Sequence, residues 1–179
     1  MSFEALLFSV DDSINSEQRV ELRKRIDGGD PNLEIFDLND VQHEIDYEES
    51  YARKLKEMLS KRVNRVFLIN SPNLCKIVDE DDFTVVNDPL LDDETQTVVR
   101  NLFATERGKG KKQSKLVLLS LSKEEDQLPN GLLQIEHVCM LDNDGNIDPH
   151  KINIVIGLSR LTVQKEKEKK EKDTGCIIV

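Results

Sequence analysis

A run of four apolar residues, 66–69 (VFLI), most strongly constrains the fold, because the chain turns polar directly after it and reaches Ser71-Pro72. A short continuous run rich in β-branched and aromatic residues is typical of a strand that is covered on both faces. Pro72 lacks the N–H that a sheet ladder needs and disfavours helical geometry at Ser71, so the strand has to end there. In an open parallel sheet, partners and ligands bind at this carboxyl end of the strands.

Predicted strands alternate with predicted helices along the chain. The strands are expected at residues 5–10, 33–36, 66–69, 116–119 and 135–141. The helices are expected at residues 16–26, 44–62, 92–105 and 152–161, the first ending at Gly28-Gly29 and the last favoured over a strand by its place in the pattern. This alternation predicts an α/β fold in which an open, mostly parallel five-stranded sheet carries helices on both faces. We place the domain at residues 1–163 and a charged tail at 164–179.

Composition excludes several classes of protein. The chain has 179 residues, which suits one domain, and its formal net charge of −10 argues against nucleic-acid binding. Cys75, Cys139 and Cys176 lie far apart in the sequence, so they form neither a disulfide framework nor a metal-ligand pattern and favour a reducing, cytosolic or nuclear compartment. No stretch approaches the roughly 20 apolar residues of a membrane span, and the N-terminus does not resemble a signal peptide.

Motif searches predict neither a cofactor nor a metal. The chain contains no phosphate-binding glycine loop, dinucleotide fingerprint, zinc-protease helix or nucleophile elbow. The three histidines, His43, His137 and His150, have no Cys or carboxylate at ligand spacing. The segment 142–148 (DNDGNID) has its glycine at the fourth position and lacks the acidic twelfth residue of a calcium loop, so we interpret it as a turn.

Three segments resemble the SEFIR/TIR superfamily, the cytoplasmic signalling domains of interleukin-17 receptors, of their adaptor and of Toll/interleukin-1 receptors. They are ALLFSVDDS near the N-terminus, RVFLINSPNL around the third strand, and SKLVLLSLSKEEDQLPNGLLQIEHVCML further on. The resemblance covers about residues 4–161 and implies a flavodoxin-like fold. It also implies that the third strand stops at Ser71-Pro72 because an exposed, variable loop follows.

The resemblance implies two alternative functions. Most SEFIR and TIR domains pair with like domains through exposed helices and loops. Some TIR domains instead cleave NAD with a glutamate in the helix after the Ser-Pro strand, usually close behind a Trp. This chain has no Trp and has Thr97 where that glutamate belongs, with Glu94 and Glu106 out of register. We therefore predict a non-enzymatic signalling adaptor or regulator that binds SEFIR or TIR domains or itself, with an NAD-cleaving enzyme as the alternative.

Charge predicts a contact surface around helix 92–105. Residues 79–94 contain eight acids and no base, and residues 107–115 form a basic, glycine-containing loop. Opposite charges at the two ends of a helix favour head-to-tail pairing, in which acid of one copy meets base of another. The residues expected to contact a partner are Arg100, Lys109, Lys111, Lys112, Asp92, Asp93 and Glu94. The alternative is that both segments are merely solvated.

The last four residues, Cys176-Ile-Ile-Val, match the C-a-a-X pattern for prenylation. We expect a lipid at Cys176, with a frayed apolar end as the alternative. One lipid chain gives only reversible membrane binding, and the lysines of the preceding tail are nearly balanced by acids. The sequence thus predicts a cytoplasmic protein that is weakly held at the cytoplasmic face of a membrane.

Overall fold

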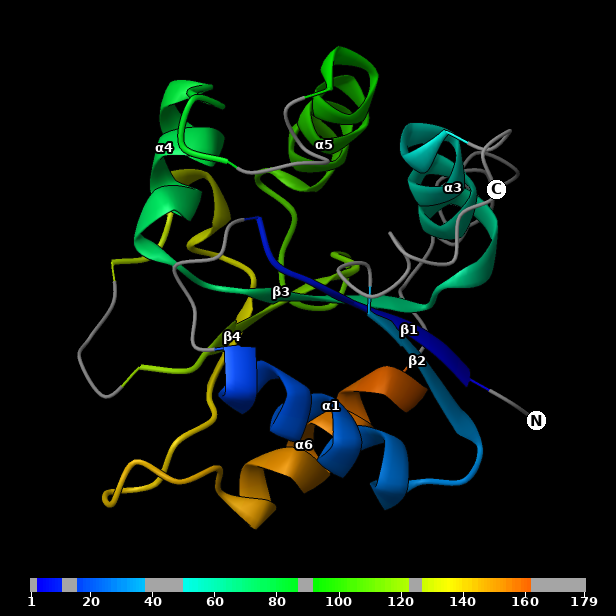
Figure 1. Ribbon diagram of the computed structural model, residues 1–179, viewed down its shortest axis with the longest axis vertical. Helices are drawn as coiled ribbons and strands as arrows, with labels where there is room; N and C mark the ends of the chain where they lie inside the picture. The colour runs from blue at the N-terminus through cyan, green and yellow to red at the C-terminus, as the bar shows by residue number, and fades with distance from the viewer. Residues whose placement is uncertain (1–2, 11–15, 38–49, 87–91, 123–126, 162–179) are drawn as a thin grey trace, which may run out of the picture.

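A five-stranded sheet forms the centre of the structure, a computed structural model that describes residues 3–10, 16–37, 50–86, 92–122 and 127–161 (Figure 1). The strands are β1 (Phe3–Phe8), β2 (Leu33–Asp37), β3 (Arg65–Ile69), β4 (Leu116–Ser120) and β5 (Glu136–Cys139). Their order is β2-β1-β3-β4-β5, and every neighbouring pair is parallel. This is the strand order of flavodoxin-like domains, so the predicted fold class is confirmed.

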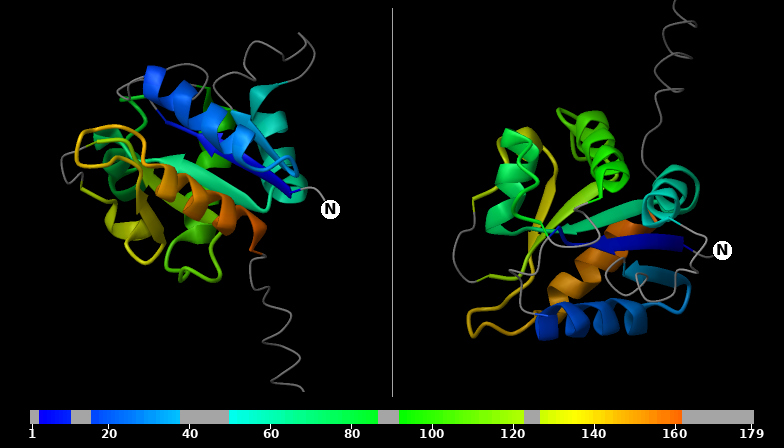
Figure 2. Two further views of the ribbon diagram at one scale, coloured as in Figure 1. Left: turned by 90° about the horizontal axis from the view of Figure 1, so that it is seen from below. Right: turned by 45° about the horizontal axis from the view of Figure 1, so that its top comes forward.

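Helices cover both faces of the sheet, as predicted. The helices are α1 (Ser16–Gly29), α3 (Tyr51–Glu57), α4 (Pro72–Glu80), α5 (Asp93–Glu106) and α6 (Pro149–Arg160), with a π-helical turn η1 (Met58–Arg62) and a 3-10 turn η2 (Asn130–Leu132). α1 and α6 lie side by side under one face, and α3, α4 and α5 lie on the other (Figures 1 and 2). Among the described helices, none is both long enough and apolar enough to cross a membrane.

The core consists of two apolar layers, one on each side of the sheet. In β3, Val66 and Leu68 pack towards α3, α4 and α5, whereas Phe67 and Ile69 pack towards α1 and α6. All four of these side chains are fully buried. Successive side chains of a strand point to opposite faces, so a strand with helices on both sides needs an uninterrupted apolar run.

The prediction of an exposed loop after Ser71-Pro72 is wrong, because α4 begins there. Pro72 is the first residue of this helix, where its fixed φ suits the helix and no intrahelical N–H bond is lost, and Ser71 keeps an extended backbone at φ −144°. Leu74, Ile77 and Val78 then bury one face of α4 at helical spacing. The helix includes Asp79 and Glu80, so the acidic loop predicted at 79–94 starts two residues later than expected, at Asp81.

Other predicted boundaries differ by a few residues. α1 continues through Gly28-Gly29 instead of ending at Ile26, and Gly29 lies so close to α6 that an added Cβ would be 2.3 Å from a methyl carbon of Ile156. The predicted strand 135–141 is shorter, and in the predicted helix 44–62 residues 44–49 lie outside the described ranges. The final helix is confirmed, and it begins at Pro149 with Asp148 as its N-cap.

The turn predicted at 142–148 is confirmed, and its first acid has a structural role. The Asp142 carboxylate accepts hydrogen bonds from the N–H groups of Asp144 and Asn146, both at 2.9 Å. Gly145 has φ +83°, a left-handed backbone that glycine adopts without strain. The Asp142 oxygen is therefore used to close the turn.

An ion pair between a buried carboxylate and a half-exposed arginine joins the end of α6 to the turn before β2. Arg160 donates from Nε and Nη2 to one carboxylate oxygen of Asp30, at 2.9 and 2.6 Å, and the other oxygen accepts from Asn32 N–H at 2.9 Å. The Asp30 side chain is only 3% exposed. The Asn32 N–H and the Arg160 guanidinium together hold the pKa of Asp30 below its ordinary value of 3.8.

We expect Asp30→Asn to lower the melting temperature near neutral pH and to matter less in acid. The folded state lowers the pKa of Asp30. The stability that this carboxylate contributes is therefore fully present above pH 3.8 and is lost as the pH falls through the lowered pKa. Thermal melts of the natural chain and the variant between about pH 7 and 2 measure the difference between their melting temperatures. Glu34→Gln, at an exposed position on β2, is the control. A difference in melting temperature between the natural chain and Asp30→Asn that stays the same in acid would contradict this role of Asp30.

Candidate functional site

The usual ligand position of this fold is the carboxyl edge of the sheet between β1 and β3, where the strand order reverses. The described residues there, Ser9, Asn70 and Ser71, are each at most 5% exposed. Asn70 Nδ2 donates to Gln127 O at 3.4 Å, and its buried Oδ1 has no hydrogen-bond partner among the described residues. Buried side chains close the described part of this edge.

A serine and a histidine also meet near this edge. Ser120 Oγ at the end of β4 lies 2.7 Å from His137 Nε2 on β5. Such a contact is one signature of an activated nucleophile. Ser120 is only 3% exposed, however, so its hydroxyl is not open to a substrate. The contact links the edge strand β5 to β4.

An open groove of about 750 Å³ lies between α3 and α5. α5 lines it with a stripe at helical spacing, namely Glu94, Thr97, Val98, Asn101, Leu102 and Thr105. α3 contributes Ala52, Arg53 and Lys56, and the loop after α5 contributes Lys109 and Lys115. The groove thus has apolar and small side chains along its length and four cations around it.

The acidic end of α5 follows from its capping residues. Asp92 is the N-cap, and its carboxylate accepts from Thr95 N–H at 3.3 Å and from Thr95 Oγ1 at 3.1 Å. Asp93 and Glu94 in the first turn are exposed, where negative charge is favoured by the helix dipole. The helix buries Val99, Leu102 and Phe103 against the core and leaves a face of Thr97, Asn101 and Ala104 exposed.

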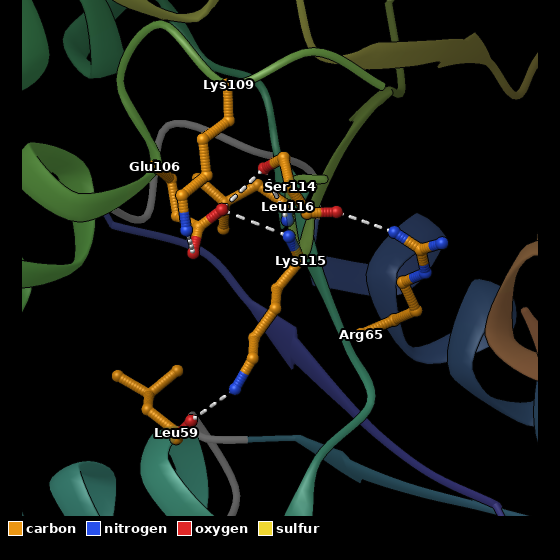
Figure 3. Close-up of polar contacts among 7 residues, drawn as sticks. All are labelled: Leu59, Arg65, Glu106, Lys109, Ser114, Lys115 and Leu116. Atoms are coloured by element: carbon orange, nitrogen blue, oxygen red, sulfur yellow. Dashed lines mark hydrogen bonds and ion pairs between the residues drawn. The ribbon is translucent and has the colours of Figure 1, made fainter. Parts of the chain in front are cut away.

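The basic end of α5 is held by one buried carboxylate (Figure 3). Glu106, the last residue of α5, is 3% exposed, and its Oε2 accepts from Ser114 Oγ at 2.8 Å and from Lys115 N–H at 3.0 Å. Its Oε1 lies 3.5 Å from Lys109 Nζ. Lys115 Nζ donates to the carbonyl of Leu59 at 3.1 Å and so ties the loop to the first turn of η1. The loop from 107 to 115 is therefore fixed at both ends.

A buried arginine supports the same loop from the opposite side of the sheet (Figure 3). Arg65, at the start of β3, donates to Ser114 O at 2.6 Å and to Leu158 O on α6 at 3.2 Å. Burial lowers the pKa of the Arg65 guanidinium, while the carboxylates of Glu136 and Glu106 oppose that shift, and arginine stays protonated at physiological pH.

The structure places the predicted partner-binding residues along α5 and in the loop after it, with Asp92, Asp93 and Glu94 at the start of the helix and Arg100 in its middle. Arg100 forms an ion pair with Asp81 at 2.7 Å and lies over the ring of Phe83, so it joins α5 to the turn after α4. Lys111 is 3.9 Å from Glu136 and its side chain is 63% exposed. Lys112 is exposed as well. Partner binding by these residues stays a prediction, and Cys176 lies outside the described residues.

Part of the predicted acidic segment has local structural roles. Asp79 on α4 accepts from the N–H groups of Asn130 and Gly131 at 2.8 and 3.0 Å, which fixes η2. Asp82 accepts from the N–H of Thr84 at 3.0 Å and from its hydroxyl at 2.6 Å. The acids that remain exposed beside the groove are Asp93 and Glu94.

The residues considered for NAD cleavage, Glu94, Thr97 and Glu106, all line the α3–α5 groove. The helix directly after the Ser-Pro strand is α4, whereas Thr97 and Glu94 lie exposed on α5. Glu106 is buried and hydrogen-bonded to Ser114 and Lys115. Within the described ranges, no three His, Cys, Asp or Glu side chains are grouped so that they could hold a metal ion.

No protein-family model matches the chain, and no curated protein matches it significantly.

Proposed function

We propose that this chain is a non-enzymatic signalling adaptor or regulator of the SEFIR/TIR kind, which acts by pairing with SEFIR or TIR domains. The observation that carries the proposal is α5, an exposed helix beside an open groove with acids at one end and a fixed basic loop at the other. The flavodoxin-like strand order is consistent with the sequence resemblance.

Local charge supports a protein partner with mixed charge. The whole chain carries a net charge of −10, yet the loop 107–115 is basic and is held against the core by Glu106. An acidic partner surface that meets this loop is repelled only weakly by the negative charge of the rest of the chain beyond a Debye length of about 8 Å. Opposed patches of this kind speed encounter and select the orientation of the partner.

Reversing the exposed lysines of the basic loop tests the proposal. We expect Lys111→Glu with Lys112→Glu to weaken binding to a SEFIR or TIR domain by roughly tenfold and to flatten its salt dependence. Lys109 is left unchanged in this variant because its ammonium lies beside Glu106. Pull-down followed by titration at low and high salt measures both effects.

Lys24→Glu with Lys151→Glu is the matched control, because it makes the same charge change on α1 and α6, on the other face of the sheet. Equal weakening by both variants would show a general charge effect. If the chain binds no SEFIR or TIR domain at all, the proposal fails.

The enzymatic alternative has a separate test. Purified chain incubated with NAD is expected to release no nicotinamide above the rate of a buffer blank. Nicotinamide release that is abolished by Glu94→Gln would replace the adaptor proposal by an NAD-cleaving one. Both experiments use the same folded protein.

The proposal also includes a prenyl group at Cys176, which would hold the domain weakly at the cytoplasmic face of a membrane. A single lipid chain gives reversible binding, so we expect a partial membrane fraction that Cys176→Ser moves to the soluble fraction without changing the melting temperature. Fractionation and intact mass from eukaryotic cells measure this. A chain of unmodified mass would contradict the anchor.

A further inference from the structure

The exposed face of α5 is complementary to itself when two copies meet in opposite directions. Asp93 and Glu94 lie at its start, and Lys109 and Lys111 follow its end. An antiparallel pair of such helices therefore sets acid against base at both ends of the contact. We propose that the chain forms a two-fold symmetric dimer in which α5 of each copy lies antiparallel on α5 of the other, at the mouth of the α3–α5 groove.

The sequence spacing fixes the register of this pair. With Asn101 on the two-fold axis, Asp93 lies eight residues before the centre, about 12 Å along the helix at 1.5 Å per residue. It then faces the loop that follows Glu106 in the partner copy, where Lys109 and Lys111 lie beyond the end of the helix. The same centre sets Thr97 opposite Thr105, and it brings the two Asn101 amides together, where each can donate to the other.

The side chains on this face allow the two helices to approach closely. Thr97, Asn101, Ala104 and Thr105 are exposed and small, and Thr97, Asn101 and Thr105 also line the groove. Small side chains permit interaxial distances at the short end of the usual 8–10 Å. At an interaxial distance of about 9 Å, the two Asn101 Cα atoms would lie about 4–5 Å apart at the crossing point, since each Cα is about 2.3 Å from its own axis.

Two-fold pairing explains the charges more completely than a head-to-tail chain does. In the symmetric dimer one contact satisfies the acidic end and the basic end of both helices at once, and the assembly closes at two copies. In a head-to-tail assembly, every oligomer would still have one acidic helix end and one basic helix end without a partner, however many copies it contained. The inference rests on the proposed function only in assuming that the domain works by pairing with its own kind.

A cysteine at Asn101 tests the register directly. In full chain with Cys75, Cys139 and Cys176 replaced by serine, Asn101→Cys is expected to form a covalent dimer under mild oxidation, because symmetry-related Cα atoms at this distance suit a disulfide. Thr105→Cys is the matched control, exposed on the same face but about 12 Å along the axis from its own copy. Equal cross-linking of both variants, or none at Asn101→Cys, overturns the proposal.

Mixing two charge variants tests the complementarity. Asp93→Lys with Glu94→Lys, and separately Lys111→Glu with Lys112→Glu, are each expected to self-associate at least tenfold more weakly than the natural chain in sedimentation equilibrium. The two variants mixed together are expected to form a heterodimer, because each then meets opposite charge at both ends. Circular dichroism confirms that each variant is folded.

A natural chain that stays monomeric at about 100 μM, or a mixture that fails to form the heterodimer, overturns the dimer. Assembly beyond two copies would instead identify head-to-tail pairing and also overturn it. Binding of an isolated SEFIR or TIR domain is measured separately, so the proposed function can stand or fail independently of this result.

Discussion

Replacing Glu106 by alanine is expected to lower the free energy of unfolding by about 3 kcal/mol. The carboxylate is 3% exposed and accepts hydrogen bonds from Ser114 Oγ and Lys115 N–H. Its removal leaves both donors without this acceptor, and each buried donor that loses its partner costs about 1–3 kcal/mol. The loop 107–115 also loses its attachment to α5, so the lysines of the contact surface lose their fixed positions.

Glu106→Gln and Glu94→Ala separate this explanation from a general effect of charge. Glutamine keeps an oxygen that can accept hydrogen bonds from Ser114 and Lys115. We therefore expect Glu106→Gln to lower the free energy of unfolding by roughly half as much as Glu106→Ala does. Glu94 is exposed on the same helix, and its replacement by alanine should change stability by no more than about 0.5 kcal/mol. Urea unfolding of the three variants gives the comparison. Similar losses for Glu106→Ala and Glu94→Ala would show that Glu106 has no special role.

Arg65→Ala is expected to have an effect of similar size, about 3 kcal/mol. The guanidinium is only 3% exposed and donates to two backbone carbonyls, Ser114 O before β4 and Leu158 O on α6. These carbonyls belong to segments on different sides of the sheet, so the arginine joins them through the start of β3. Hydrogen bonds from a charged donor are worth about 1.5–3 kcal/mol each.

Arg53→Ala provides the control for Arg65, because Arg53 is exposed on α3 and its loss should be nearly neutral. The double variant Arg65→Ala with Glu106→Ala should lose less unfolding free energy than the two single variants lose in sum, because both side chains position Ser114. Additive losses would contradict the view that they stabilise one loop together. Denaturant titrations measure all of these differences.

The sequence predicted the sheet well because burial leaves a direct pattern in a parallel strand. β3 and β4 are covered on both faces, so each residue has to be apolar regardless of which face it meets. The helix α6 was predicted at residues 152–161 by its place in the alternating pattern, and the structure adds its first turn, which begins at Pro149 after the N-cap Asp148. These signals are local in sequence.

The missed features depend on contacts between distant residues. α4 was predicted as loop because half of its sequence is polar, yet Leu74, Ile77 and Val78 bury one face against the core. Nothing around Glu106 in the sequence distinguishes it from the many exposed acids, since its partners Ser114 and Lys115 belong to a loop that returns to it. Arg65 likewise begins an apolar strand without any local sign that it is buried.

The structure also changes the interpretation of the charged residues. Asp79, Asp81 and Asp82 were grouped with the acids that could meet a partner, whereas each is occupied by a contact within the domain. Near α5, Asp93 and Glu94 at its start and Lys111 and Lys112 in the basic loop are exposed. The proposed contact surface uses these residues.

Amide chemical-shift mapping tests most directly the claim that α5 is the contact surface for SEFIR or TIR domains. The isotope-labelled chain is titrated with an isolated, unlabelled SEFIR domain and then with a TIR domain. We predict that the largest shift changes fall on α5 and on residues 107–115, and that α1 and α6 on the opposite face stay unchanged. Saturable changes confined to α1 and α6, or no change with either domain, would contradict the claim.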